Sequence, residues 1–101
     1  MVAPMYRVVF TRQAAKDAKK LKAAGLDTKA KDLVAVVERD PFAYPPAFEP
    51  LVGSLSGMYS RRINRQHRFV YEVTDEPMEI NGVGYDGTIK VLSMWTHYET
   101  V

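Results

Sequence analysis

The residues best suited to chemistry form a dense group of cations in the middle of the chain. Four arginines and one histidine fall within eight positions: Arg61, Arg62, Arg65, His67 and Arg68. The planar guanidinium group of arginine matches the oxygens of a phosphate. The simpler alternative is that these side chains point into water or pair with carboxylates on the surface. The density of the cluster favours a phosphate-binding surface.

Few acid–base groups accompany these cations. The chain has no cysteine, which excludes disulfides, thiolate catalysis and cysteine-ligated zinc. It also lacks a Walker loop, a serine-nucleophile motif and any His or carboxylate cluster at metal-ligand spacing. We therefore expect neither a metal nor a cofactor. What remains is Glu49 or Glu72 as a base, and His97 or Tyr98 as an acid.

RNA cleavage can be carried out by such groups because RNA contains its own nucleophile, the 2′-hydroxyl. The reaction needs a base at that hydroxyl, cations at the phosphate oxygens and an acid at the departing 5′-oxygen. Structural roles are the alternative: Glu49 as an exposed loop acid, His67 as a hydrogen-bonded residue beside a turn, and His97 as the end of a strand. The residues alone leave open both a ribonuclease and a non-catalytic module that binds RNA or protein.

The cations lie on a predicted β-hairpin. Residues 58–63 and 67–73 are strand-like, and the polar residues 64–66 between them predict a three-residue connection. Upstream, residues 41–50 contain four prolines and are expected to form an ordered loop. Residues 51–52 are expected to add a short strand.

The first part of the chain predicts a strand followed by a helix. Residues 5–10 are β-branched and aromatic, and Thr11 follows them where a helix N-cap belongs. Residues 12–24 are rich in Ala and Lys, and Gly25 suits the helix end. Apolar residues recur at helical spacing at Ala14, Ala18 and Leu21. Lysines occupy the other side, as a solvated face or as contacts for RNA phosphate: Lys16, Lys19, Lys20 and Lys22.

A second helix is predicted over residues 28–39, with Asp27 as its N-cap. Asp40-Pro41 ends it, because the residue before a proline avoids helical dihedral angles. Its apolar stripe predicts a core-facing side and consists of Ala30, Leu33, Val34 and Val37. Towards the C-terminus, residues 78–83 and 88–95 are extended, and 84–87 with its Asp-Gly pair predicts the turn between them. The last run is apolar on both faces, which is typical of a central strand.

This order of elements predicts an α+β fold, with two helices packed on one face of a twisted antiparallel sheet. We expect a single domain over residues 1–101, with 1–4 as a disordered extension. No apolar run approaches the about 20 residues that a membrane span needs. The first residues lack the features of a signal peptide, so an intracellular, cytoplasmic protein is expected. The net charge is only +2, so the local basic face matters more than the whole-molecule field.

Two segments resemble the YoeB/Txe group of the RelE toxin superfamily. The first reads Glu-Pro-Leu and then Leu-Ser-Gly-x-Tyr-Ser-Arg-Arg-Ile-x-x-x-His-Arg-x-Val-Tyr, within residues 49–71. The second is Met-Trp-Thr-His-Tyr at 94–98. The resemblance extends from Met5 to about Tyr98. It implies a RelE-like β-α-α-β-β-β(-β) fold and a toxin of a bacterial toxin–antitoxin module.

The resemblance also implies an activity and partners. The activity is ribosome-dependent cleavage of messenger RNA in the A site, which stops translation. The partners are the ribosome, the messenger, a YefM/Axe-type antitoxin and, only through the antitoxin complex, operator DNA. A homodimer is a further expectation. A gyrase-directed ParE-like toxin on the same fold is the rival, because fold alone does not decide function.

Site roles follow from the same resemblance. Glu49 matches the general base, Arg68 the residue that stabilises the phosphate in the transition state, His97 the general acid and Tyr98 its support. The remaining contacts to RNA are expected from Arg61, Arg62, Arg65, Lys16, Lys19 and Lys20. Two departures stand out: residues 99–101 follow the His-Tyr pair, and residues 78–88 are longer than in short family members, so a protruding hairpin is expected.

Overall fold

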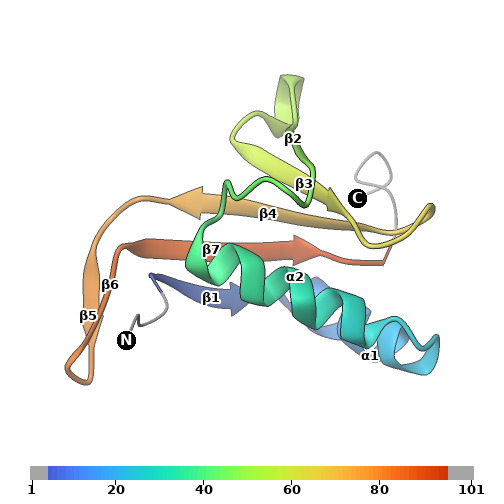
Figure 1. The fold of residues 1–101 in the computed structure, drawn as a ribbon, viewed down its shortest axis with the longest axis horizontal. Helices are drawn as coiled ribbons and strands as arrows, with labels where there is room; N and C mark the ends of the chain where they lie inside the picture. The colour runs from blue at the N-terminus through green and yellow to red at the C-terminus, as the bar shows by residue number, and fades with distance from the viewer. Residues whose placement is uncertain (1–4, 96–101) are drawn as a thin grey trace.

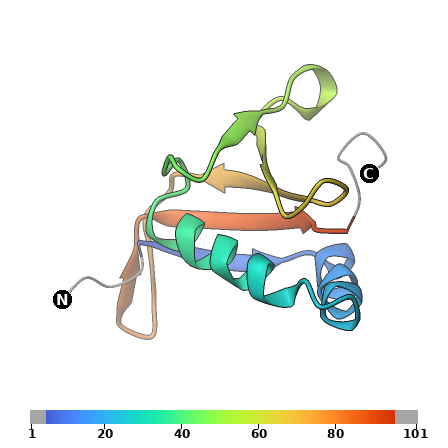
Figure 2. The ribbon, with the colours of Figure 1, turned by 45° about the vertical axis from the view of Figure 1, so that its right-hand side comes forward.

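The computed structural model describes residues 5–95 of the 101-residue chain. Two helices cover one face of a five-stranded sheet, and a two-stranded ribbon projects from the sheet (Figures 1 and 2). In chain order the elements are β1 (Tyr6–Phe10), α1 (Arg12–Ala23), α2 (Asp27–Arg39), β2 (Phe48–Pro50), the 3-10 helix η1 (Gly53–Leu55), β3 (Met58–Arg62), β4 (Arg68–Thr74), β5 (Met78–Ile80), β6 (Val83–Tyr85) and β7 (Gly87–Ser93).

The caps of the two helices differ from each other. The Thr11 hydroxyl oxygen accepts from the backbone N–H of Ala14 at 3.0 Å, so the predicted N-cap of α1 is confirmed. The prediction that Asp27 caps α2 is wrong, because Leu26 holds that position and Asp27 is already the first helical residue. The Asp27 carboxylate still lies in the first turn, where the helix dipole favours negative charge. Its Oδ2 lies 3.7 Å from the Nζ of Lys31.

Both helices bury one side against the sheet, but the stripe of α1 differs from the prediction. Ala14 and Leu21 are buried as expected, whereas Ala18 is exposed. Asp17 takes the inward position instead, with only 2% of its surface exposed. The helices meet strand residues in one hydrophobic cluster whose buried members include Leu33, Val37, Phe69, Tyr71, Ile89 and Val91.

The sheet has the order β1-β7-β4-β3-β2. The predicted α+β fold with two helices on one face of the sheet is confirmed. The neighbours from β2 to β7 pair antiparallel as predicted, and the one correction is that β1 runs parallel to β7, which makes the sheet mixed. The helices carry the chain from β1 to the far edge, and the meander then returns strand by strand. Its last strand, β7, arrives beside β1 in the same direction. The predicted interior position of β7 is confirmed.

Two local predictions in the second half are corrected. The short strand lies at Phe48–Pro50 and not at residues 51–52. The second hairpin turns at Asn81-Gly82 and not at residues 84–87. Asn81 (φ 50°) and Gly82 (φ 82°) both have positive φ, as a two-residue type I′ turn requires. The ribbon β5–β6 projects at the end of the sheet where β4 finishes (Figures 1 and 2), as the longer segment led us to expect.

Within the described part of the chain, no helix is long and apolar enough to cross a membrane. The prediction of a single domain over residues 1–101, with 1–4 as an extension, reaches beyond the described residues and stays a prediction.

Candidate functional site

Strand pairing gathers a carboxylate and two guanidinium groups on one face of the sheet. Glu49 on β2 is opposite Ser60 on β3, and Arg62 on β3 is opposite Arg68 on β4. Ser60 and Arg62 are two residues apart on one strand, so all four side chains share a face. Phe69, next to Arg68, packs in the core with the helices. The shared face is therefore the one that the helices leave uncovered.

These side chains line a hollow of about 150 Å³, formed by Ala47, Phe48, Glu49, Ser60, Arg62 and Arg68. It is smaller than the about 300–1,000 Å³ of typical small-molecule pockets. A phosphate group fits such a depression better than a whole nucleotide does. Among residues 5–95 the ion pairs are Asp27–Lys31 and Glu72–Lys90, so the charged groups of the hollow do not neutralise one another there. The hollow thus presents cations and a carboxylate to an incoming ligand.

The turn between β3 and β4 holds Arg68. The Asn64 side-chain oxygen accepts from the backbone N–H groups of Gln66 (2.9 Å) and His67 (2.7 Å), which closes the turn as an Asx motif. Nη1 of Arg68 donates to the backbone oxygens of Asn64 (3.1 Å) and Arg65 (3.4 Å). The guanidinium group is therefore oriented by the turn before any substrate binds.

Arg61 does not belong to this surface, which corrects its predicted role as a phosphate contact. It is 1% exposed, because β3 points it to the core side, opposite to Arg62. Its three nitrogens donate to Pro46 O (2.6 Å), Pro41 O (3.1 Å) and the Tyr71 hydroxyl (3.2 Å), and its guanidinium carbon lies 4.8 Å from the centre of the Phe48 ring. Arg61 ties the loop before β2 to the sheet.

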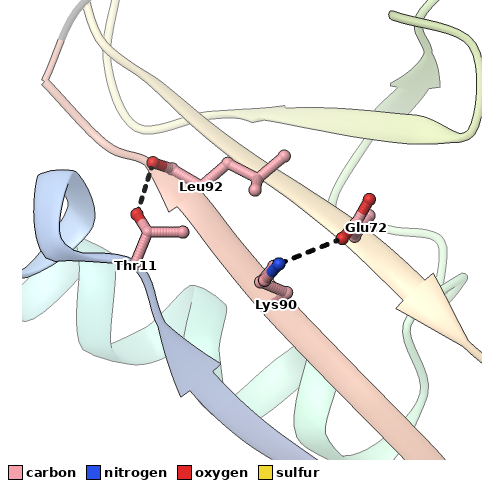
Figure 3. A network of polar contacts seen from close by, with 4 residues as sticks. All are labelled: Thr11, Glu72, Lys90 and Leu92. Carbon is pink, nitrogen blue, oxygen red and sulfur yellow. Dashed lines mark hydrogen bonds and ion pairs between the residues drawn. The ribbon is translucent and has the colours of Figure 1, made fainter.

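The other predicted RNA contacts lie outside the hollow. Arg65 is exposed in the turn between β3 and β4, and Lys16, Lys19 and Lys20 are exposed on α1. The alternative base, Glu72, lies four residues along β4 from Arg68 and is engaged by Lys90 at 3.8 Å (Figure 3). Four strand residues span about 13 Å, so Glu72 is too distant to serve the same phosphate. His97 and Tyr98 lie outside the described residues.

Ser60 is a site residue that the sequence did not single out. It is 2% exposed, and its hydroxyl has no hydrogen-bond partner among the described residues. It faces Glu49 across the β2–β3 pair and lines the hollow. Strand alternation could have found it, because a serine two residues before Arg62 must share that side chain's face.

His67 is buried beside the site, next to Arg68 in the chain. Its ring stacks on Trp95 with 4.1 Å between ring centres and 21° between planes. Burial lowers the pKa of His67, and the charge of Asp17 opposes this by raising it. A neutral histidine in a stack agrees with the structural role considered for it above, although its Nδ1 has no hydrogen-bond partner among residues 5–95.

A larger hollow, of about 400 Å³, lies between the two helices. Its walls are mostly apolar, and it lacks the convergence of carboxylate and arginine side chains that the smaller hollow has. Among residues 5–95 no group of three His, Cys, Asp or Glu side chains could hold a metal ion. The chemistry available to the described residues is thus concentrated on the face formed by β2, β3 and β4.

Comparison with known proteins places the chain in a family. Residues 10–98 match the model of the YoeB-like toxins of bacterial type II toxin–antitoxin systems. A YoeB toxin of Streptomyces coelicolor is 50% identical over 48 residues, which are 48% of this chain and 57% of that toxin. A YoeB toxin of Escherichia coli is 42% identical over 57 residues, 56% of this chain and 68% of that toxin.

Solved structures agree over nearly the whole chain. A YoeB/ParE toxin from Agrobacterium tumefaciens has a TM-score of 0.76 at 31% identity and covers 91% of this chain and 99% of its own. A YoeB dimer from Staphylococcus aureus has a TM-score of 0.72 at 30% identity, with 93% and 99% covered. Escherichia coli YafQ, at 17% identity and a TM-score of 0.72, shares the fold, with 94% and 97% covered. The chain therefore belongs to the YoeB-like toxins of type II toxin–antitoxin systems, within the RelE/ParE superfamily.

Proposed function

We propose that this toxin is a metal-independent endoribonuclease that cleaves messenger RNA in the ribosomal A site and so inhibits translation. The observation that carries the proposal is the shared face of Glu49, Arg62 and Arg68 around one small hollow. A carboxylate beside two guanidinium groups meets the needs of phosphate-directed acid–base chemistry. Membership of the YoeB-like family supports the same conclusion.

In the proposed reaction, the Glu49 carboxylate takes the proton of the 2′-hydroxyl. The 2′-oxygen attacks the adjacent phosphorus, and the bond from phosphorus to the 5′-oxygen breaks. His97, supported by Tyr98, gives a proton to the departing 5′-oxygen. The products are a 2′,3′-cyclic phosphate and a 5′-hydroxyl, so atoms and protons balance without water or a metal.

Arg68 and Arg62 would stabilise the negative charge that builds on the phosphate oxygens. Donors that are oriented before the reaction are the effective ones, because they need no rearrangement as charge develops. Arg68 meets this condition through its bonds to the turn at Asn64 and Arg65. The exposed side chain of Arg62 lies opposite Arg68 in the β3–β4 pair and is the second proposed phosphate contact.

The ribosome, the messenger and an antitoxin of the YefM/Axe type are the proposed partners, with operator DNA reached only through the antitoxin complex. The Staphylococcus aureus relatives are described as a YoeB dimer and as YoeB–YefM complexes, which supports both an antitoxin and a homodimer here. Exposed Lys16, Lys19, Lys20 and Arg65 supply a basic surface for ribosomal RNA.

A single-turnover assay tests the assignment. Ribosomes programmed with a defined messenger are mixed with the parent toxin and with Glu49→Gln, Arg68→Gln and His97→Gln, and the cleavage rate is measured. Each variant is expected to be slower by a factor of about 10² or more, since acid, base and oxyanion groups contribute about 10²–10⁴. Lys29→Gln, on an exposed part of α2, is the control and should cleave at the parental rate.

Parental rates for Glu49→Gln and His97→Gln would contradict the proposal. Inhibited translation with uncut messenger would instead support a non-catalytic binding module. An intact messenger, unaffected translation and inhibited gyrase would support the ParE-like alternative.

A further inference from the structure

Side chains from other parts of the fold hold the end of β7 at three points. The Thr11 hydroxyl donates to the backbone oxygen of Leu92 at 2.8 Å (Figure 3). The backbone N–H of Met94 donates to Oδ2 of Asp17 on α1 at 2.9 Å. The Trp95 ring stacks on His67, at the end of the β3–β4 turn. Leu92, Met94 and Trp95 are thus held by the N-cap of α1, by the second turn of α1 and by the hairpin that carries Arg68, respectively.

The backbone N–H of Met94 is held by a buried carboxylate, that of Asp17, which is energetically unfavourable to bury. Asp17 is 2% exposed and forms no ion pair among the described residues, although burying a carboxylate without a cation is costly. Its two oxygens accept from the side-chain nitrogen of Gln13 (2.8 Å) and from Met94 N–H (2.9 Å). A charged acceptor makes the second bond stronger than a neutral one would be. The bond to Asp17 therefore holds the backbone of Met94 in place, at the cost of burying a carboxylate.

His67 joins the same end of β7 to the site. It precedes Arg68 directly, it is 4% exposed, and its flat ring covers the ring of Trp95. The hairpin turn itself uses only the backbone of His67, through bonds with Ile63 and Asn64. The imidazole is therefore not needed for the turn, and its ring is stacked on Trp95.

We propose that Asp17 and His67 are positioning residues that fix where the chain leaves β7, and so where the His97 imidazole can reach relative to Arg68. The inference rests on the proposed function, in which His97 is the general acid. His97 lies two positions after Trp95 in the chain, and two residues of chain span at most about 7 Å. A proton donor must come within about 2.6–3.2 Å of its acceptor. An anchor two residues away is close enough to control that distance.

Double-mutant cycles test the proposal on ribosome-bound messenger. His67→Leu removes the stack and Asp17→Leu removes the acceptor for Met94. Each is expected to lower kcat about 10- to 100-fold, because a misplacement of about 1 Å can cost 10²-fold, while KM stays within a factor of two. In a His97→Gln background the same substitutions are expected to change kcat less than twofold, because they act through His97.

Two conservative variants and one destabilising control separate positioning from general loss of structure. His67→Phe keeps an aromatic ring on Trp95 and Asp17→Asn keeps an oxygen acceptor, so both should retain at least a third of the parental kcat. Val37 is fully buried on α2 and far in the chain from the end of β7. Val37→Ala should therefore lower stability and leave kcat unchanged. Full-size losses in the His97→Gln background, or parental kcat for both leucine variants, would overturn the proposal.

A measurement without RNA tests the positioning role of His67 separately from the assignment of His97 as the general acid. The ¹⁵N relaxation of the residue 97 amide is recorded for the parent and for His67→Leu. Greater amplitude of fast motion in the variant is expected if the stack positions this segment, and unchanged relaxation would overturn that role. If His97→Gln cleaves at the parental rate, the proposed acid is wrong, whatever the relaxation shows. Trp95 is the only tryptophan, so its fluorescence reports directly whether the stack is lost.

Discussion

At the scale of single residues, Arg61 and Arg62 are adjacent in the chain and have opposite surroundings. β3 turns Arg61 into the core, where two carbonyl oxygens and the Tyr71 hydroxyl accept hydrogen bonds from its guanidinium group. The same strand turns Arg62 outward to the hollow that it shares with Glu49. The buried surroundings of Arg61 also affect Tyr71: burial raises the pKa of the Tyr71 phenol, and the charge of Arg61 partly opposes that rise.

Lysine substitutions at these two positions should separate folding from catalysis. Arg61→Lys keeps the charge but cannot reach all three acceptors, so we expect it to lower the free energy of unfolding by about 1.5–3 kcal/mol. Arg62→Lys should change stability by less than about 0.5 kcal/mol and slow cleavage. Urea denaturation and single-turnover cleavage measure the two effects. Equal stability losses in both variants would contradict the burial argument.

His67 predicts a dependence of stability on pH. Burial lowers its pKa below the usual 6.5, so the unfolded chain binds a proton that the folded chain resists. Stability should therefore fall as pH drops below about 6.5. His67→Phe, which has no proton to bind, should lose less stability between pH 7 and pH 5 than the parent. Urea midpoints at both values measure this, and identical pH dependence in parent and variant would show that His67 does not contribute.

At the scale of elements, the joint between β4 and β7 depends on a glycine. A Cβ built on Gly87 would lie 2.2 Å from the backbone oxygen of Thr74 and 3.0 Å from the ring of Tyr6. Gly87 pairs with Tyr6 in the parallel register of β1 and β7. The Tyr6 hydroxyl in turn donates to Asp75 at 2.8 Å, which raises the pKa of the phenol. Three chain segments thus meet where a side chain has no room.

Gly87→Ala should consequently destabilise the fold. Overpacking commonly costs about 1–3 kcal/mol, and a backbone atom can move less than a side chain, so we expect about 3 kcal/mol. Gly84→Ala is the matched control: it lies in the neighbouring strand β6, and a Cβ there meets nothing within 4 Å. Its effect should stay below about 0.5 kcal/mol. Comparable urea midpoints for the two variants would contradict the close approach at Gly87.

The elements that local chemistry dictates were predictable from the sequence, whereas those that depend on distant pairing were less so. Thr11 as a cap and residues 64–66 as a turn follow from nearby residues alone. The Asn81-Gly82 turn carried as strong a signal as the Asp-Gly pair, and the choice between them is decided by which strands pair. The parallel partnership of β1 and β7 joins segments about 80 residues apart. Asp17 was missed because a carboxylate on the inner side of a helix is exceptional.

The residues of the candidate site were also predictable in part. Register alone brings Glu49, Arg62 and Arg68 to one face, and the family resemblance had already selected them. Arg61 could have been excluded by strand alternation, since it neighbours Arg62 on the same strand. The roles of His97 and Tyr98 stay predictions, because both lie outside the described residues.

At the scale of the whole molecule, the net charge of +2 hides an uneven distribution. α1 presents exposed lysines, and the hollow presents arginines on the other side of the sheet. Arg68 begins β4, and the β5–β6 ribbon lies beyond the other end of that strand (Figure 1). A large, charged partner such as a ribosome can contact several of these regions at once, which a small substrate cannot.

Neutralising the α1 lysines should weaken docking and spare the chemistry. The variant with Lys16, Lys19 and Lys20 all changed to Gln should raise KM for ribosome-bound messenger, because phosphate contacts contribute salt-dependent affinity, and should keep kcat. A charge-matched control changes Lys29, Lys31 and Lys90, which lie elsewhere. Equal KM values in the two triple variants, measured across salt concentrations, would show that α1 does not face RNA.

The most direct test of the central claim replaces the nucleophile. A messenger carrying a single 2′-deoxy nucleotide at the scissile position in the A site is placed on ribosomes, and new 5′ ends are mapped by primer extension with the parent toxin. Attack by the 2′-hydroxyl predicts no cut in this messenger, and a cut with a 5′-hydroxyl end in the all-ribose messenger. A cut at the deoxy position, or 5′-phosphate ends in the all-ribose messenger, would contradict the account.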